Sequence, residues 1–492
     1  MIDTYFYDAD EFGRKEILSS ADEINETNLI PILTQALGVH GMNQLAIDYL
    51  YRYTKGEQPI LGREKKFRKD ICNNIVENHA SEIAQFTSGY FMGEPVTYVR
   101  RGDKASTSEA VARLNDYMFY EDKSSHDKDL ATWMAICGVG YRMVLPDKEF
   151  GVEPDSSPFE LDIPDPRYTF VVYSTGFGHK RLMGVRNIYR QIGEAFHAIN
   201  CVYTPTHYYE VVDGVIDKSK TRQHSLGDIP IFEYRLNMTR MGSFEPAIPL
   251  LNAINTVLSN RIDSVEQYVQ SFLKFKNCDV DDEVVRKINE LGAIVLQSGE
   301  GKDADVDIVS QELNQQQTQT LVDYLYDQVL TICGLPTTTK GGSSTSDTGA
   351  AVFLRDGWSQ CEARARDTEA LFKRSEKQFL RLVLKILHDT DGMDLSLADI
   401  ECKFTRRQHD NLLTKTQALL HMLEAGLAPE VAIATSGLFN DPMDVTLQSK
   451  EYLKKWDYIE MTTDTEAEED EHDDEENRDD EDEDNEEDEK SV

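Results

Sequence analysis

The feature that most constrains this fold is a narrow apolar stripe in residues 246–272, which read PAIPLLNAINTVLSNRIDSVEQYVQSF. Apolar residues recur there at spacings of three and four, while Asn, Ser, Asp and Gln fill the other positions. This periodicity predicts one helix of about 40 Å. A stripe this narrow suits packing against one or two neighbouring helices rather than burial in a globule. The residues expected to pack are Leu251, Ile254, Leu258, Ile262, Val265 and Val269.

A second helix is predicted at residues 314–334, where Leu321, Leu325 and Ile332 share one face. The stretch between the two helices, residues 273–313, has the pattern of a small αβ unit. Such a unit is too small to be stable alone, so we expect it to depend on neighbours. An acidic group lies near the start of its expected helix: Asp279, Asp281, Asp282 and Glu283.

The remaining segments predict an α+β fold. Helical patterns, including one over 73–92, then a short strand at 96–99 and further strand-like segments separated by Gly, Pro and Asp, fill residues 1–245. A long helix is expected at 348–390, and helical patterns continue through 391–457. The loop at 335–347 is rich in Thr, Ser and Gly, a composition typical of flexible linkers. Its singled-out residues are Thr337, Thr338, Thr339, Lys340, Gly341, Gly342, Ser343, Ser344 and Thr345.

The charge balance is acidic throughout, with a formal net charge of −38. Residues 460–492 hold 21 Asp and Glu against Arg478 and Lys490, so half of that charge belongs to the tail and half to the rest. An acidic body disfavours tight static binding of nucleic acid, which needs clustered cations. The tail, 458–492, is expected to be disordered. It is interpreted as a solvated tail, a phosphate mimic for a basic partner, or a cation-binding tract.

No motif predicts catalysis, a metal site or a cofactor. The TTTKGGSS order places Lys340 before the glycines and follows a helix, unlike a phosphate-binding loop. Gly138-Val139-Gly140 is interpreted as a turn, and His79 as a core or interface histidine. Seven scattered cysteines without a CxxC pair fit reduced thiols rather than a disulfide framework or zinc site. No run of about 18 apolar residues occurs, so no membrane partner is expected.

Three local motifs and the order of the segments resemble the portal proteins, or head–tail connectors, of tailed bacteriophages with long non-contractile tails. The motifs are NNIVENHASEIAQFTSGYFMGEPVTY (73–98), HSLGDIPIFEYRLN (224–237) and ICGLP (332–336). The resemblance covers residues 20–457, roughly, and it rests on the order of the motifs because none is a catalytic signature. It implies a portal fold by position: a wing at 1–245 and 348–390, stem helices at 246–272 and 314–334, a clip at 273–313, a tunnel loop at 335–347 and a crown at 391–457.

The resemblance also implies a structural function without enzymatic activity. Twelve copies would form a ring at one vertex of the capsid. The protein would be located in the virion and, during assembly, in the host cytoplasm. Double-stranded DNA would pass through it during packaging and ejection, touching it transiently and non-specifically. The implied partners are the large terminase subunit, the major capsid and scaffolding proteins, and a head-completion adaptor.

Two of these expectations have bland alternatives. The loop around Lys340 is hypothesised to be a compliant gasket around moving DNA. The alternative is an ordinary linker that does not contact DNA. The acidic residues Asp279, Asp281, Asp282 and Glu283 are candidate contacts for the terminase. The alternative is that they form a solvated helix N-terminus. For the whole chain, the alternatives are an acidic interaction protein or assembly chaperone acting through its tail, and a hydrolase with an unrecognised site.

Overall fold

The computed structural model divides the chain into two compact units, Met1–Asn411 and Leu412–Val492, which are described separately. It describes residues 13–66, 69–101, 105–152, 155–192, 195–269, 272–276, 305–309, 315–337, 358–404 and 412–439, with a few single positions between 442 and 452.

The first unit contains a six-stranded sheet in the order β1-β5-β6-β7-β8-β9, in which β1 lies parallel to β5 and the other neighbours are antiparallel. The long helix α1 (Leu29–Thr54) packs on this sheet, burying Leu29 and Leu33 against Phe170. The β8–β9 hairpin turns at Asp213 and Gly214, both with positive φ, as a tight two-residue hairpin requires. The strands are β1 (Ile17–Ser19), β5 (Thr169–Ser174), β6 (Arg181–Ile192), β7 (Ala195–Tyr203), β8 (His207–Val212) and β9 (Val215–Gln223).

A second, three-stranded sheet has the order β10-β3-β4 and is covered by helices. Its strands are β10 (Ile231–Arg235), β3 (Val139–Pro146) and β4 (Phe159–Asp162), and the helices of this core are α3 (Ala105–Tyr120), α4 (Lys123–Cys137) and α9 (Trp358–Asp391). Gly138 ends α4 with φ +80°, and a Cβ there would lie 2.2 Å from the Arg240 carbonyl oxygen. The predicted turn therefore holds at Gly138, whereas Gly140 lies within β3.

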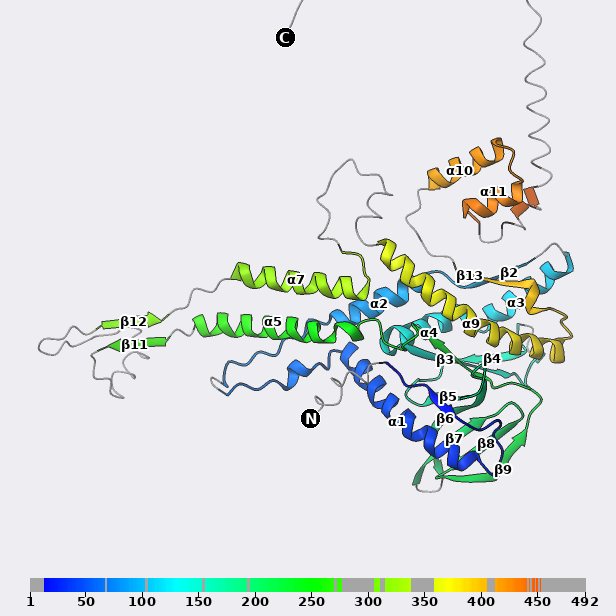
Figure 1. Ribbon diagram of the computed structural model, residues 1–492, viewed down its shortest axis with the longest axis horizontal. Coiled ribbons are helices and arrows are strands. Elements are labelled where there is room, and N and C mark those ends of the chain that lie inside the picture. Colours follow the sequence, from blue (N-terminus) through cyan, green and yellow to red (C-terminus); the bar gives the residue numbers. More distant parts are fainter. Residues whose placement is uncertain are drawn as a thin grey trace, which may run out of the picture. The chain divides into compact units, whose positions relative to one another are not determined.

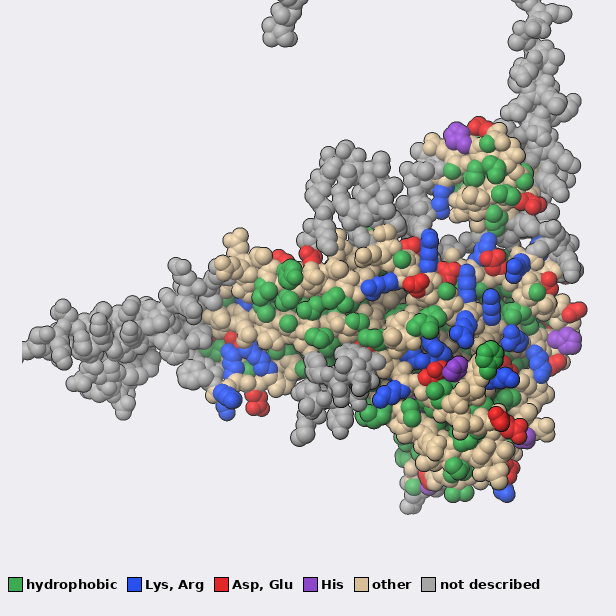
Figure 2. Space-filling view, in the orientation of Figure 1, with side chains coloured by type: hydrophobic (Ala, Val, Ile, Leu, Met, Phe, Trp, Pro, Cys, Tyr) green, Lys and Arg blue, Asp and Glu red, His purple; other side chains and the backbone are tan. Residues whose placement is uncertain are grey.

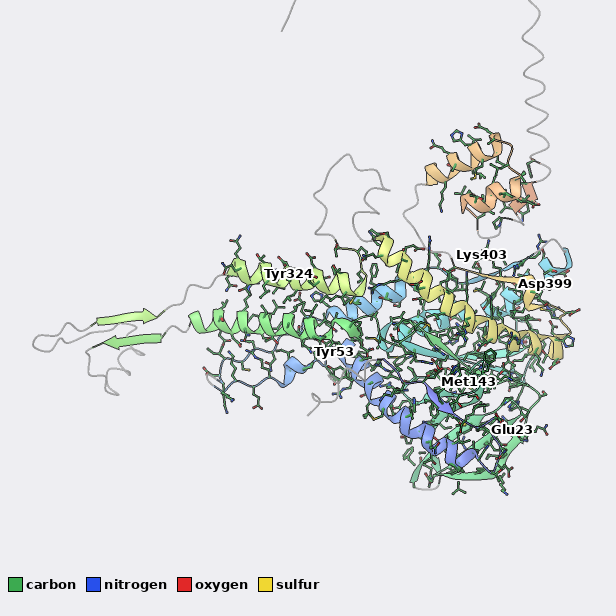
Figure 3. All side chains as sticks on the ribbon, viewed as in Figure 1. Glu23, Tyr53, Met143, Tyr324, Asp399 and Lys403 are labelled. Carbon is green, nitrogen blue, oxygen red and sulfur yellow. The ribbon has the colours of Figure 1, made fainter. Side chains whose placement is uncertain are left out.

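A third pairing joins segments far apart in the sequence. The strand β2 (Thr97–Arg100) follows α2 (His79–Phe91) and pairs antiparallel with β13 (Ile400–Lys403). Figure 3 labels Asp399 and Lys403 beside this pair, and Asp399 ends the short 3-10 helix η4 (Leu397–Asp399). The structure therefore differs from the all-helical pattern expected for 391–457, because residues 400–403 complete a sheet with β2.

Two helices, α5 (Ile248–Val269) and α7 (Gln315–Cys333), lie side by side in the first unit and lead toward the antiparallel pair β11 (Phe272–Lys276) and β12 (Asp305–Val309) (Figure 1). The chain enters α5 through the 3-10 helix η3 (Glu245–Ala247). Another 3-10 helix, η2 (Pro59–Gly62), packs on α5.

The second unit consists, in its described part, of α10 (Leu412–Glu424) and α11 (Pro429–Ser436), which pack together. Gly426, with φ +80°, ends the turn between them. The mixed helical and sheet architecture expected from the sequence is confirmed. Among the described residues, no helix combines the length and apolar character needed to cross a bilayer.

Candidate functional site

The helix α5 changes surroundings along its length. Ile248, Leu251 and Ile254 are buried in a core shared with Phe244. Farther along, the same stripe emerges, and Ile262 is 42% exposed. The first turns of α5 therefore anchor it in the unit, as Figure 3 illustrates near Tyr53 of α1, whose hydroxyl donates a hydrogen bond to Asn252 Oδ1 at 2.9 Å.

The predicted apolar stripe of α5 is thus divided between buried and exposed environments. Leu258 is half-buried, and Val265 is 43% exposed. The side chain of Val269 lies outside the described residues. Among the described side chains of the predicted stripe, those at its start are fully buried in the core of the chain, and Leu258 packs against that core.

A polar stripe on α5 holds an extended segment of the chain. Asn255, Ser259 and Asp263, four residues apart, are all buried. Their side chains accept hydrogen bonds from the backbone N–H groups of Glu77 (2.9 Å), Ile75 (3.0 Å) and Asn73 (2.7 Å), respectively.

The spacing of these three bonds has a geometric cause. Four helical residues rise about 6 Å, and two extended residues span about 6.6 Å, so every second N–H of a strand-like segment meets every fourth side chain. This pairing overrides the helix predicted for 73–78, since α2 begins only at His79. Part of the polar face of α5 is consequently covered by the chain itself.

We name Asn255, Ser259 and Asp263 with the segment they bind the polar seam. At one end of it, Asp263 forms ion pairs. Lys65 Nζ lies 2.6 Å and Arg63 Nη2 lies 3.1 Å from Asp263 Oδ2. Burial works to raise the pKa of Asp263, but hydrogen bonds from Lys65 and Asn73 outweigh it and lower the pKa. The seam therefore contains an ionised carboxylate.

The helix α7 packs on the chain's own core mainly through residues other than Leu321 and Ile332, two members of its predicted packing face. Val322, Val329 and Leu330 are buried. By contrast, Leu321 and Ile332 of the predicted face are 46% and 40% exposed. The helix is locked to α5 by polar side chains as well as by apolar packing.

Arg261 supplies hydrogen bonds between the two helices. Arg261 of α5 donates to Gln315 Oε1 and to Gln319 Oε1 of α7, both at 2.6 Å. Leu325 of α7 is half-buried against the core.

The helical pair thus carries exposed apolar side chains, and hydrophobic side chains gather over α5 and α7 in Figure 2. Tyr324, labelled in Figure 3, is 58% exposed. Burial of such side chains against another protein surface is favourable by about 25 cal/mol per Å². We name these residues the exposed apolar set: Ile262, Val265, Leu321, Tyr324 and Ile332.

The C-terminus of α7 and the first turns of α9 are in contact. Gly334 has φ +69°, and Arg364 of α9 donates to the Ile332 carbonyl oxygen at 2.9 Å, near the C-terminus of α7. Trp358, the first residue of α9, packs its ring against Phe86 of α2 at a centroid distance of 6.0 Å. A mainly apolar hollow of about 510 Å³ lies at this junction.

Two predicted site regions fall mostly outside the described residues. Of the loop residues singled out, only Thr337 is described, and it is buried. Thr338 to Thr345, including Lys340, lie outside. So do the acidic residues Asp279, Asp281, Asp282 and Glu283.

A buried ionic cluster seats α9 on the second sheet. Arg142 of β3 and Glu376 of α9 are both fully buried, with Nη1 and Oε2 2.8 Å apart. Lys123 lies 2.6 Å from Asp127 and 3.2 Å from Glu376, and Arg142 also pairs with Asp127. The Tyr234 hydroxyl donates to Glu376 at 2.6 Å.

The electrostatics of the cluster keep it charged. Burial works to raise the pKa of Glu376, but Arg142 and Lys123, with two tyrosine hydroxyls, lower it to about 2. Two cations and two carboxylates balance each other. Sequence patterns gave no sign of this cluster, because its members come from separate elements.

Two buried thiols of the described residues are poorly reactive. Burial raises the pKa of Cys137 and Cys333 to about 12, so these thiols stay protonated. His79 lies 2.8 Å from Glu82 and stacks on Tyr326, which fits the predicted interface or core role. Among the described residues, no group of three or more His, Cys, Asp or Glu is placed to hold a metal ion.

The chain is similar to one family of known proteins. The family model described as "Phage portal protein, SPP1 Gp6-like" matches residues 45–456. The comparison with curated proteins finds no match.

Two solved structures are similar to the chain at 12% identity each. One is entitled "Neck of empty GTA particle computed with C6 symmetry", with a TM-score of 0.43 over 73% of this chain and 90% of that chain. The other, "Virion of native gene transfer agent (GTA) particle", has a TM-score of 0.40 over 73% of this chain and 89% of that chain.

Proposed function

Since the chain belongs to the SPP1 Gp6-like family of phage portal proteins, we propose that twelve copies form a ring at one capsid vertex. Double-stranded DNA passes through this ring during packaging and ejection. The observation that carries the proposal is the exposed apolar set on α5 and α7. It lies on helices whose inner faces are already satisfied by the chain's own core and polar seam.

The exposed apolar set supplies the driving force for assembly. Completing the burial of five such side chains contributes about 1 kcal/mol each. In a closed ring every copy presents one side of its helical pair to the next, so all of these interfaces are satisfied at once. An open arrangement would leave two apolar faces in water.

The regions of the portal fold are assigned to elements as follows. The stem is α5 with α7, the clip is β11 and β12 with the intervening residues, and the crown begins with α10 and α11. The wing comprises the two sheets and α9. The strand β13 joins the wing, because it pairs with β2.

The channel works by weak contact with DNA. An acidic body repels phosphates, and low adhesion lets a duplex slide. Residues 335–347 form the tunnel loop, and its Lys340 touches phosphates briefly. On either side of this loop, Arg364 donates a hydrogen bond to the C-terminus of α7 and Trp358 packs on Phe86.

Docking of other proteins occurs away from the stem. Asp279, Asp281, Asp282 and Glu283 of the clip face the large terminase subunit, which supplies ATP hydrolysis. The clip also receives the head-completion adaptor. The major capsid and scaffolding proteins contact the outer surface of the ring.

The experiment changes two members of the exposed apolar set together, Ile262→Asp and Leu321→Asp. The matched control is Leu45→Asp with Val215→Asp, which alters two exposed apolar residues of α1 and β9. We expect rings from the wild type and the control, and single copies with unchanged circular dichroism from the test variant, measured by native mass spectrometry. Rings of undiminished mass from the test variant would refute the assignment of the interface.

A further inference from the structure

The helix α9 presents a row of cations on its outer side. Arg374, Lys377 and Arg381 follow each other at spacings of three and four, and all are exposed. Lys180, also exposed, lies in the turn between β5 and β6. Figure 2 shows Lys and Arg side chains gathered over α9, although the chain as a whole is acidic. We name these four residues the basic stripe.

The basic stripe is not neutralised by its neighbours. Elsewhere on α9, Arg366 pairs with Glu362 at 2.9 Å and Lys373 pairs with Glu369 at 2.7 Å. Within the part of the chain that the structure describes, the four side chains of the basic stripe form no ion pair or hydrogen bond. Their charge is therefore available to an anionic partner.

The stripe borders a hollow of about 360 Å³, which Arg374, Arg381 and Lys180 help to line. Its two carboxylates are already engaged. Asp228 lies 2.7 Å from Arg181, and Glu233 lies 2.7 Å from Arg240 and 3.0 Å from Arg235. The hollow therefore has unpaired positive charge on its α9 wall.

We propose that this hollow and the basic stripe bind the acidic tract at residues 464–489 of a second copy of this chain. The tract is the chain's densest run of Asp and Glu, and it is complementary in charge to the stripe. The inference rests on the proposed ring, in which each copy brings one tract to its neighbour at high effective concentration.

The shape of the site favours a peptide over a duplex. A hollow of this size admits extended carboxylate side chains, each able to take a forked contact from a guanidinium. A rigid duplex offers its phosphates only to protruding cations. Covering the stripe with carboxylates also removes a surface to which genomic DNA would otherwise adhere in a salt-dependent manner.

The experiment uses two full-length versions of the chain, co-expressed with different affinity tags. The first keeps the basic stripe and carries Asn and Gln in place of Asp and Glu across 464–489. The second keeps the acidic tract and carries Lys180→Arg and Lys377→Arg, which preserve charge but remove the amines. Carbodiimide then couples carboxylates to lysine amines in the complex purified on both tags.

A cross-link between Lys377 or Lys180 and the acidic tract can form there only between two copies, and we expect mass spectrometry to detect it. Adding Arg374→Glu and Arg381→Glu to the first version should lower the yield of this cross-link roughly tenfold. The matched reversal Lys218→Glu with Lys220→Glu, on exposed positions of β9, should leave the yield unchanged.

Three results would overturn the inference. A complex recovered on both tags without the cross-link removes the tract as occupant. Loss of duplex DNA binding in full-length Arg374→Glu with Arg381→Glu, without any cross-link in the paired versions, assigns the stripe to DNA. Failure to recover a complex on both tags refutes the proposed ring itself, and with it this inference.

Discussion

Neutralising the buried carboxylate of α9, by Glu376→Gln, tests how this helix is held. Glu376 is fully buried and accepts hydrogen bonds from Arg142 at 2.8 Å and from Tyr234 at 2.6 Å. Its other oxygen lies 3.2 Å from Lys123. Without its charge, two buried cations face only the carboxylate of Asp127.

The expected cost follows from that imbalance. Breaking a buried ion pair by removing one partner costs about 3–5 kcal/mol, because an uncompensated charge remains in the interior. The amide of Gln keeps the size and one acceptor, so we expect the lower part of this range. That is a large share of the roughly 5–15 kcal/mol that stabilises a folded domain.

The assay is urea denaturation followed by circular dichroism, with Glu369→Gln as the control on the same helix. Glu369 pairs with Lys373 nearer the surface, so its loss should cost about 0.5 kcal/mol. Adding Lys123→Met to Glu376→Gln restores neutrality and should recover more than 1 kcal/mol relative to additive losses. Additive losses, or a cost for Glu376→Gln no larger than the control's, would refute the reasoning.

Other changes test the seam, the α7 exit and the first helix. Gly334→Ala should lower stability by about 1–3 kcal/mol in thermal melts, because φ is +69° and a Cβ would lie 2.4 Å from Arg364, whereas Gly38→Ala, with no atom within 4 Å, should not lower it. Asp263→Ala should cost about 2–3 kcal/mol in urea titrations, since it leaves backbone and cationic donors of the seam without an acceptor; a loss below 0.5 kcal/mol, on the order of experimental error, would contradict this. Burial lowers the pKa of His40 from 6.5 to about 4. The unfolded chain therefore takes up this proton first, and wild type should lose about 3 kcal/mol relative to His40→Gln as pH falls from 6.5 to 4; a constant difference would refute it.

Local periodicity predicted the helices α5 and α7 well. The expected ranges 246–272 and 314–334 correspond to α5 and α7 within three residues at each end. A long stripe with spacings of three and four indicates a helix from the local sequence alone, so it can be recognised without knowledge of the fold. The sequence also predicted the strand after α2, which is β2.

Long-range contacts explain what the periodicity could not predict. Residues 73–78 have helical spacing, yet they are extended because α5, far along the chain, satisfies their N–H groups through Asn255, Ser259 and Asp263. The four-residue spacing of those three polar residues was the available signal. Likewise, β13 at residues 400–403 needs a partner strand about 300 residues earlier.

The pattern of α7 alone does not show which face packs on the chain's own core. Leu321 and Ile332 share a helical face with Leu325, but the core lies toward Val322 and Val329. Both faces are apolar, and only the position of α5 decides which one is buried. The basic stripe on α9 had a visible spacing in the sequence, but its unpaired state depends on which carboxylates the fold brings near it.

Imaging the purified full-length protein by electron microscopy tests the central claim most directly. The account predicts closed rings with a central opening, and twelve copies of the 56.0 kDa chain give a particle of about 670 kDa. Particles that remain single copies, or compact oligomers without an opening, would contradict it.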